Sequence, residues 1–271
     1  MTAARPRVVV KLGGDVLAGP ALASVAREIA RARDTGARLA IVHGGGPQAT
    51  ELSKRLGLSP VIVGGRRVTD AATLDVMKMV VAGRLNVDLC GALRAAGVAA
   101  VGVSGTSGVI RATKRPPRVV SGGGDAPVDF GFVGDVESFD VDLLELLEAA
   151  GRVPVVACLG ADDAGGALNI NADVVASQLA AALKADALVA CTAVGGVRKD
   201  KDDPASRLAR LTVAEARAAI ADGTVQGGMI PKLEEAFAPL AAGVGAVHIV
   251  GPGELARSLE APGSVGTLLV A

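Results

Sequence analysis

The 271-residue chain has no Trp or Tyr and only four Phe. Few side chains are therefore available to stack on nucleic-acid bases or to build aromatic cages. Its 28 Lys and Arg residues are balanced by 28 Asp and Glu residues, so no net charge attracts the chain to nucleic acid or to an anionic membrane. We therefore expect neither nucleic acid nor a membrane as a partner.

Long apolar runs and metal-binding patterns are also missing. No apolar stretch approaches the ~20 residues that cross a bilayer, and no signal region follows Met1 to Arg7, so a cytoplasmic protein is predicted. The three cysteines, Cys90, Cys158 and Cys191, lie in apolar stretches without the spacing of a metal site. We predict that they are buried, reduced thiols.

The apolar residues, half of the chain, form an alternating series of short and long segments. Short β-branched runs predict strands, and longer runs of helical period predict helices, as in βαβ units around a mainly parallel sheet. The predicted strands are Val8–Val10, Leu39–Val42, Val98–Val103, Val153–Ala157, Ala187–Ala190 and Val247–Val250. The predicted helices are Ala21–Asp34, Gln48–Leu56, Ala71–Ala96, Val141–Ala150, Asn171–Lys184, Thr212–Ala221 and Pro231–Leu240. The series indicates an α/β fold.

Two interruptions divide this series. Between Val109 and Val136 the periodicity breaks into short segments, which predict hairpins over a sheet edge or a cleft. We interpret Lys114–Arg118 within this region as a solvated hairpin face. Glycine and aspartate near Ala161–Gly166 interrupt the second half of the sheet pattern. We therefore predict an N-terminal lobe over residues 1–163 and a C-terminal lobe over residues 164–271.

Glycines and a lysine follow the predicted strands at the end where open α/β sheets bind ligands. Lys11 closes the first strand, and Gly13 and Gly14 after it allow a phosphate to approach the backbone closely. After the second strand, Gly44–Gly46 lead into a helix whose N-terminus favours an anion. We interpret His43, just before these glycines, as a packing or loop-anchoring residue.

A second lysine and an aspartate occur later in the chain. Asp173 lies in the first turn of a predicted helix, where Asn171 is either a simple cap or part of a site. Lys232 lies in the first turn of another helix, after Gly227 and Gly228. A cation there opposes the helix dipole, so Lys232 requires an anion, which Asp173 or a phosphate would supply.

Several common nucleotide-binding motifs are absent. The chain has no G-x-x-x-x-G-K-[ST] sequence, and no G-x-G-x-x-G sequence follows the first strand. Two lysines, several glycine turns and one aspartate, without a Ser–His or Cys–His pair, favour phosphoryl transfer, in which the protein mainly positions reactants and neutralises charge.

From Val8 to about Thr267 the chain resembles the amino acid kinase family. The resemblance rests on the order and spacing of Lys11–Gly14, His43–Gly46, Gly65–Asp70, Gly131–Val136, Asn169–Asp173 and Gly227–Lys232. It implies a three-layer αβα sandwich of the carbamate kinase-like fold, with acyl-amino-acid binding in the N-terminal lobe and nucleotide binding in the C-terminal lobe. Within the family the chain is most similar to the enzymes that use ATP to phosphorylate the γ-carboxylate of N-acetyl-L-glutamate in arginine biosynthesis.

The resemblance also implies roles for individual side chains. Lys11 and Lys232 would flank the transferring phosphoryl group and stabilise its charge, and Asp173 would hold both ammonium groups. Arg67 would bind the α-carboxylate of the substrate, for which a planar guanidinium is suited. Asn169 would form a hydrogen bond with the substrate.

Backbone contacts are implied mainly at glycines. Gly45 and Gly46 would border the attacking carboxylate, and Gly13 and Gly14 would lie beside the phosphates. The other nucleotide-binding residues implied are Ala193, Val194, Gly195, Gly196, Val197, Arg198, Thr224, Val225 and Gln226. Mg2+ is expected to arrive with the ATP phosphates and not at a site of the protein's own, because no carboxylates cluster in the sequence.

Three positions depart from the family pattern. Ala193 and Ser107 stand where the family usually has an aspartate, and Cys158 stands where it usually has a proline. The residues implied in catalysis all remain. We therefore interpret the departures as tuning of nucleotide binding, with one nucleotide-side hydrogen bond missing at Ala193.

Two other functions stay open. A kinase of the same family could act on aminoadipate or glutamate attached to a small acidic carrier protein, in lysine or arginine biosynthesis. It would need a basic surface, for which Lys114–Arg118 is the only candidate in the sequence. A non-catalytic amino-acid sensor of the same fold would bind its ligand without turnover.

The predicted helix Ala71–Ala96 suggests a homodimer. It would be about 39 Å long, and apolar residues repeat along it at helical spacing. These residues are Leu74, Met77, Val81, Leu85 and Leu89. A helix that extends beyond a small lobe commonly gains part of its cover from a second copy.

Overall fold

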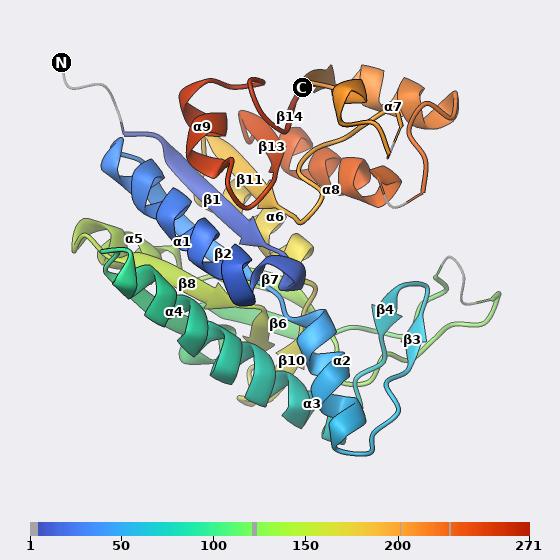
Figure 1. Ribbon diagram of the computed structural model, residues 1–271. Helices are drawn as coiled ribbons and strands as arrows, with labels where there is room; N and C mark the ends of the chain where they lie inside the picture. The colour runs from blue at the N-terminus through green and yellow to red at the C-terminus, as the bar shows by residue number, and fades with distance from the viewer. Residues whose placement is uncertain (1–4, 121–123, 201, 228) are drawn as a thin grey trace.

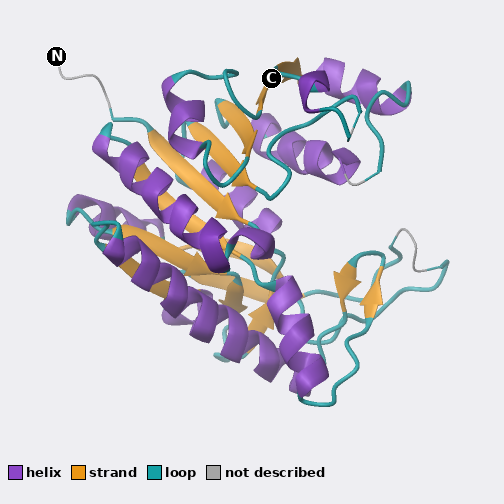
Figure 2. Ribbon diagram, in the orientation of Figure 1, coloured by secondary structure: helices purple, strands orange, loops and turns teal. Residues whose placement is uncertain are grey.

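The computed structural model describes residues 5–120, 124–200, 202–227 and 229–271. Its centre is an eight-stranded sheet with helices on both faces (Figure 1, Figure 2). In spatial order the strands are β12 (Arg210–Thr212), β14 (Thr267–Val270), β13 (Ala246–Val250), β11 (Ala187–Cys191), β1 (Arg7–Leu12), β2 (Arg38–His43), β8 (Val153–Ala157) and β5 (Ala100–Ser104). Neighbouring strands are parallel except β13 and β14. The predicted α/β fold is confirmed.

All six predicted strands belong to this sheet, and the predicted helices form with small differences at their ends. The helices are α1 (Gly19–Asp34), α2 (Gly46–Arg55), α3 (Ala71–Met77), α4 (Asn86–Ala95), α5 (Val141–Ala149), α6 (Ala172–Ala182), α7 (Val213–Ala221), α8 (Met229–Ala241) and α9 (Leu255–Glu260). A capping box joins Thr212 and Glu215 at the start of α7. The sequence pattern misses β12 and β14, because such short strands show no clear period.

The predicted helix over Ala71–Ala96 is continuous and consists of α3, a π-helical stretch (Lys78–Leu85) and α4. Its apolar stripe faces the interior of the same molecule, with all five side chains at most 6% exposed. Met79 and Val87, in contrast, are apolar and exposed. The stripe therefore needs no second copy to cover it, and a dimer contact on this segment would use the other face.

Two smaller sheets form from the hairpins predicted between Val109 and Val136 and from their neighbours. One has the order β10 (Ala167–Asn169), β9 (Leu159–Ala161), β6 (Ile110–Lys114) and β7 (Gly134–Phe139). The other is the hairpin of β3 (Ile62–Val63) and β4 (Arg66–Arg67), which projects from the body (Figure 1). The predicted lobe boundary at residues 163 and 164 falls in the turn between β9 and β10. The two halves of the chain therefore share the first of these sheets.

The main core contains mostly Val, Leu, Ala and Ile, in keeping with the scarcity of aromatic residues. A second, small cluster consists of Val120, Phe130 and Val133, and Val63 of β3 packs against it. Phe130 and Val133 also line the cavity described below, so this cluster connects the projecting hairpin to that cavity. Within the described ranges, no helix is long and apolar enough to span a membrane.

Candidate functional site

The candidate site lies where β1, β2, β8 and β11 end, at the carboxyl edge of the main sheet. The loops that follow parallel strands meet at this edge and commonly bind ligands there. A cavity of about 520 Å³ opens at this edge, and Lys11, Gly45, Arg67 and Asn169 are among its lining residues. A smaller cavity of about 80 Å³ shares Lys11 and Asp173 with it. We call these the large cavity and the small cavity.

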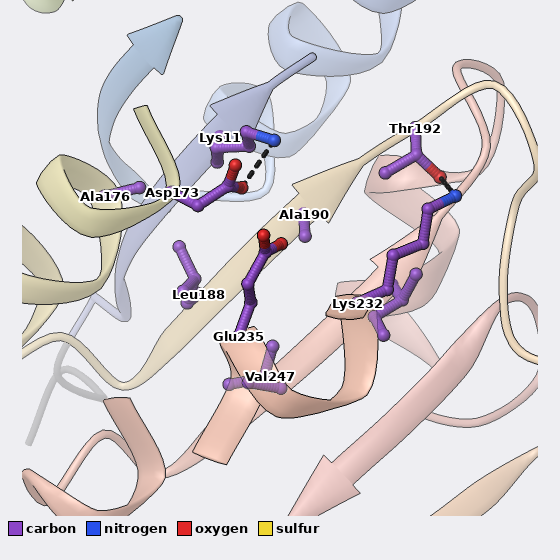
Figure 3. Close-up of a pocket in the computed structure, with 11 residues that line it drawn as sticks. Lys11, Asp173, Ala176, Leu188, Ala190, Thr192, Lys232, Glu235 and Val247 are labelled. Atoms are coloured by element: carbon purple, nitrogen blue, oxygen red, sulfur yellow. Dashed lines mark hydrogen bonds and ion pairs between the residues drawn. The ribbon is translucent and has the colours of Figure 1, made fainter. Parts of the chain in front are cut away.

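Lys11 and Asp173 form an ion pair between the first strand and the start of α6. The Lys11 Nζ atom lies 2.5 Å from Asp173 Oδ1, and both side chains are largely buried (Figure 3). Burial alone would lower the pKa of the Lys11 ammonium group, but the charge of Asp173 and the hydrogen bond with it outweigh this effect and raise the pKa. Lys11 therefore stays charged at the bottom of the large cavity.

Lys232 lies on the opposite side of the small cavity from Lys11 (Figure 3). Its Nζ atom is 3.5 Å from Thr192 Oγ1, and burial lowers the pKa of the ammonium group. In the described part of the chain Asp173 forms an ion pair with Lys11 and none with Lys232. The role of Asp173 in holding both ammonium groups stays a prediction: its carboxylate pairs with Lys11, its charge partly offsets the lowering of the Lys232 pKa by burial, and Thr192 is the hydrogen-bond partner of Lys232.

Glu235 is a site residue that the sequence analysis misses. It lies one helical turn after Lys232 in α8, and its carboxyl group points between Asp173 and Ala190 (Figure 3). Burial and the adjacent Asp173 charge raise the pKa of Glu235 to about 7. The i, i+3 spacing from Lys232 is the sequence signal that places both side chains on one face of the helix.

Gly14 and Gly45 bring the backbone close to the cavity. A Cβ atom on Gly14 would lie 2.8 Å from both Pro47 Cδ and Gln48 Oε1, and a Cβ atom on Gly45 would clash with Leu85. Gly45 caps α2, whose first amides have no acceptor within the helix. Because Gly45 and Gly46 line the large cavity, this helix start provides an anion-binding edge.

Arg67, at the end of β4, reaches from the projecting hairpin into the large cavity. Its Nη2 atom donates hydrogen bonds to Gly46 O at 3.0 Å and to Thr50 Oγ1 at 2.6 Å. Its Nη1 atom is buried and has no hydrogen-bond partner among the described residues, and burial lowers the pKa of the guanidinium. The residue as a whole is partly exposed and lines the cavity, where a planar guanidinium is suited to a carboxylate ligand. Asn169 lines the same cavity, and its Nδ2 atom donates to Thr69 Oγ1.

The interpretation of Lys114–Arg118 as a solvated face is wrong for Arg115, whereas Arg118 is exposed as predicted. Arg115 is buried, and its Nη2 atom lies 2.5 Å from Asp135 Oδ1. Arg118 is exposed, yet it lines the large cavity together with Arg115. The two prolines between them favour polyproline II geometry, in which residues three apart project from the same side.

His43 has the packing role that was predicted. It is fully buried, with Nε2 3.0 Å from Asn86 Nδ2 and Nδ1 3.0 Å from Gly44 O. Burial lowers its pKa, which keeps the ring neutral. Cys158 and Cys191 are buried free thiols with pKa values raised to about 12 by burial, whereas Cys90 is only partly buried.

The residues predicted along the nucleotide lie in two loops. The first loop follows β11 and contains Ala193–Arg198, where the Ala193 amide donates to Asp15 Oδ2 at 2.8 Å. Asp15 follows the Lys11–Gly14 segment, so this bond joins the two loops. Gly195 and Gly196 have φ values of +65° and +109°, which favour glycine. Val197 is fully buried, and its amide and carbonyl are already bonded to Thr267 Oγ1 and to the Leu208 amide.

The second loop precedes α8. Asp222 accepts a hydrogen bond from the Thr224 amide at 2.8 Å, and Gln226 donates to the carbonyl of Gly223 at 2.8 Å. Val225 is fully buried and packs in the core. Gly228, part of the motif that precedes Lys232, lies outside the described residues.

The chain matches known proteins along nearly its whole length. The model of the amino acid kinase family matches residues 6–251. An acetylglutamate kinase from Anaeromyxobacter dehalogenans is 59% identical over 268 residues, which cover 97% of this chain and 98% of that protein. An acetylglutamate kinase from Sorangium cellulosum is 56% identical over 274 residues, which cover 100% of this chain and 96% of that protein.

Solved structures agree with the fold. N-acetylglutamate synthase from Neisseria gonorrhoeae, complexed with coenzyme A and N-acetyl-glutamate, superposes with a TM-score of 0.82 at 25% identity. The match covers 98% of this chain but 59% of the synthase chain. Carbamate kinase from Giardia has a TM-score of 0.71 at 17% identity and covers 99% of both chains. With a family match over most of its length and relatives that are more than half identical, the chain belongs to the amino acid kinase family.

Proposed function

We propose that this protein is an acetylglutamate kinase, which transfers the γ-phosphoryl group of ATP to the γ-carboxylate of N-acetyl-L-glutamate in arginine biosynthesis. One observation carries the proposal: a single cavity is lined both by the Lys11–Asp173 pair and by Arg67, whose guanidinium forms no ion pair within the described residues. A dicarboxylate substrate can bring one carboxylate to each of these cations. The names of the relatives that are 56–59% identical agree with this chemistry.

In the proposed reaction, a γ-carboxylate oxygen forms a bond to the γ-phosphorus as the bond from phosphorus to the bridging oxygen of ADP breaks. The products are an acyl phosphate and ADP. The acceptor carboxylate is ionised at neutral pH, so no general base is required. The neutral, packed His43 is consistent with this expectation.

Lys11 and Lys232 are proposed to stabilise the charge on the phosphoryl group during transfer. They lie on opposite sides of the small cavity, so a group between them would contact both ammonium groups. Asp173 orients Lys11, and Thr192 orients Lys232. Charge stabilisation by preorganised donors is the main way in which proteins accelerate phosphoryl transfer.

The substrate is proposed to lie in the large cavity with its two carboxylates at different ends. Gly45 and Gly46 would border the attacking γ-carboxylate, and Gly13 and Gly14 would face the phosphates. Arg67 would bind the α-carboxylate, and Asn169 would donate a hydrogen bond to the substrate. The predicted division into an acyl-amino-acid lobe over residues 1–163 and a nucleotide lobe over residues 164–271 remains part of this proposal.

ATP is proposed to lie along the loops that contain Ala193–Arg198 and Thr224–Gln226. Mg2+ would bind with the nucleotide and neutralise charge on its phosphates. Over the described residues, no group of three or more His, Cys, Asp or Glu side chains is arranged to hold a metal ion. The lysines of the site would then contact the phosphates directly.

A homodimer remains a proposal. The exposed apolar residues Met79 and Val87 lie on the long helical segment, on the face away from the buried stripe. Light scattering of the purified protein should give twice the chain mass of 26.8 kDa. A monomeric mass at micromolar protein concentration would contradict this proposal.

ADP release tests the proposed activity. Purified protein with ATP and Mg2+ should release ADP when N-acetyl-L-glutamate is added, and much less with free glutamate or aspartate. The acyl phosphate should be trapped by hydroxylamine in equal amount to the ADP. Tight binding of N-acetyl-L-glutamate without ADP release would instead support the sensor function, and turnover only with a carrier-linked substrate would support the carrier-dependent kinase.

A further inference from the structure

The large cavity contains more positive charge than the proposed reaction uses. Arg66, Arg115 and Arg118 line it in addition to Arg67 and Lys11. Two of these five cations have carboxylate partners: Lys11 pairs with Asp173, and Arg115 pairs with Asp135. Arg66, Arg67 and Arg118 form no ion pair within the described residues. The proposed α-carboxylate contact accounts for Arg67 alone.

Arg115 serves as the anchor for Arg118. The Arg115 guanidinium donates to Asp135 Oδ1 through two nitrogens, at 3.0 Å and 2.5 Å, and its amide donates to Val133 O at 2.8 Å. The Arg118 amide and carbonyl both pair with Val128. The segment is therefore held at both ends, and the two prolines between them stiffen it. These restraints hold the Arg118 side chain at the cavity.

Arg118 is electrostatically unsatisfied in this position. Partial burial lowers the pKa of its guanidinium, and the neighbouring charges of Arg115 and Arg66 lower it further, while the charge of Asp135 only partly opposes this shift. Like charges held together in this way repel each other unless an anion lies between them. A carboxylate has enough lone pairs to accept hydrogen bonds from two guanidinium groups at once.

We propose that Arg118 is a second specificity-determining residue, which binds the substrate's α-carboxylate together with Arg67 and is held in place by the Arg115–Asp135 pair. This inference rests on the proposed function, because it assigns a residue to one group of the proposed substrate. This role for Arg118 explains why the buried Arg115–Asp135 pair and the two prolines hold its segment beside the cavity. It also predicts strong selection against acids that lack an α-carboxylate, since these would leave both guanidinium groups unpaired.

Two ligands distinguish the loss of α-carboxylate binding from a general disturbance of the cavity. N-acetyl-L-glutamate carries both carboxylates, whereas 4-acetamidobutanoate has the same acetamide and γ-carboxylate but no α-carboxylate. KM and kcat are measured for the first ligand, and the constant for competitive inhibition is measured for the second. The proteins compared are wild type, Arg118→Gln, Arg118→Lys and the control Arg111→Gln. Arg111 is exposed on β6 and pairs with Asp163 outside the cavity.

Arg118→Gln should raise KM for N-acetyl-L-glutamate by about 10-fold or more, as expected for loss of a charged hydrogen bond. Its kcat and the inhibition constant of 4-acetamidobutanoate should change by less than about twofold, because neither depends on the α-carboxylate. Arg118→Lys should give an intermediate KM, since the charge remains but the planar fork is lost. Arg111→Gln should match wild type for both ligands.

Two results would overturn the inference while leaving the proposed function intact. One is an unchanged KM for N-acetyl-L-glutamate in Arg118→Gln. The other is an equal loss of affinity for both ligands, which would mean that the substitution disturbs the cavity generally. If the wild-type protein releases no ADP with N-acetyl-L-glutamate, the proposed function fails and the inference fails with it.

Discussion

The two ends of the large cavity are built in different ways. The phosphoryl end consists of Lys11 and Asp173, which line both cavities, with Lys232 across the adjoining small cavity. These three residues lie on a central strand and on the first turns of two helices that cover the main sheet. The carboxylate end consists of Arg67 and Arg118, which lie on segments outside that sheet. The charges proposed to act in the transition state thus lie on elements of the main sheet and its covering helices, whereas the charges proposed to select the substrate lie on segments outside that sheet. Changes at the first end should affect kcat, and changes at the second should affect KM.

The largest expected effect is at the phosphoryl end. Lys11→Ala or Lys232→Ala should lower kcat by about 10²–10³-fold with a much smaller change in substrate KM, because each lysine is proposed to stabilise charge that develops in the transition state. Steady-state kinetics with both substrates would measure this, and Lys54→Ala, an exposed lysine on α2, is the matched control. Near-normal kcat in either site variant would remove that lysine from the mechanism.

At the carboxylate end, Arg67→Ala should raise KM for N-acetyl-L-glutamate by about 10-fold or more, the effect of a charged hydrogen-bond pair worth ~1.5–3 kcal/mol. The kcat value should change little, since the α-carboxylate does not react. Arg55→Ala, on an exposed position of α2, controls for loss of surface charge. An unchanged KM would place the substrate elsewhere and break the distinction between the two ends.

Glu235 should give the phosphoryl end a pH dependence that the carboxylate end lacks. Its pKa is raised to about 7, so between pH 6 and 8 it becomes an anion beside Asp173, Lys11 and Lys232. This added negative charge should weaken ATP binding, so kcat/KM for ATP should fall as pH rises through about 7 in wild type. Glu235→Gln should remove this fall, whereas Glu234→Gln, on an exposed position of α8, should keep it.

The same group should also affect stability. The folded-state pKa of Glu235 lies above the unfolded value, so the folded protein binds more protons between about pH 4.5 and 7 and the free energy of unfolding falls as pH rises through that window. Glu235→Gln should therefore raise the melting temperature relative to wild type more at pH 8 than at pH 5. An equal difference at both pH values would show that Glu235 titrates normally.

The smallest expected effect concerns the departure at Ala193. Ala193→Asp should lower KM for ATP by about two- to threefold, as for a weak net hydrogen bond. The decrease in KM for ATP should be small because Asp15 already accepts a hydrogen bond from the Ala193 amide and would repel a second carboxylate. Adding Asp15→Asn should remove this repulsion and lower KM further. If KM for ATP is unchanged in both proteins, position 193 does not contact the nucleotide.

The two ends also differ in how far the sequence predicts them. Lys11 and Asp173 are each predicted from local rules, namely a lysine that ends a strand and an aspartate that opens a helix, whereas their pairing is implied only by the family resemblance. Arg118 is exposed as predicted, but its place in the lining of the large cavity is missed, since nothing in its neighbours along the chain indicates that Asp135 binds Arg115. Arg115 and Arg118 are three residues apart with two prolines between them. This spacing is the sequence signal that could have suggested that both side chains project to the same side.

Glu235 and the hydrogen-bond partner of Lys232 also could not be predicted from the sequence. The sequence analysis assigns Asp173 to both lysines, but the carboxylate pairs with Lys11, while Lys232 contacts Thr192. Which of several nearby groups forms the pair depends on side-chain directions across α6, α8 and β11. Distances of a few ångströms decide such pairings, and element boundaries predicted from the sequence do not resolve them.

The sequence by itself determined the α/β fold, the positions of the main strands and helices, and the glycine turns and lysines at the strand ends, because periodicity and backbone requirements act over a few residues. Only the tertiary structure decided that the stripe on the long helical segment is covered by the same molecule, that Glu235 faces Asp173, and that Arg115 and Arg118 line the large cavity. These facts depend on contacts between segments far apart in the chain, and burial and charge at such contacts arise only when the chain is folded.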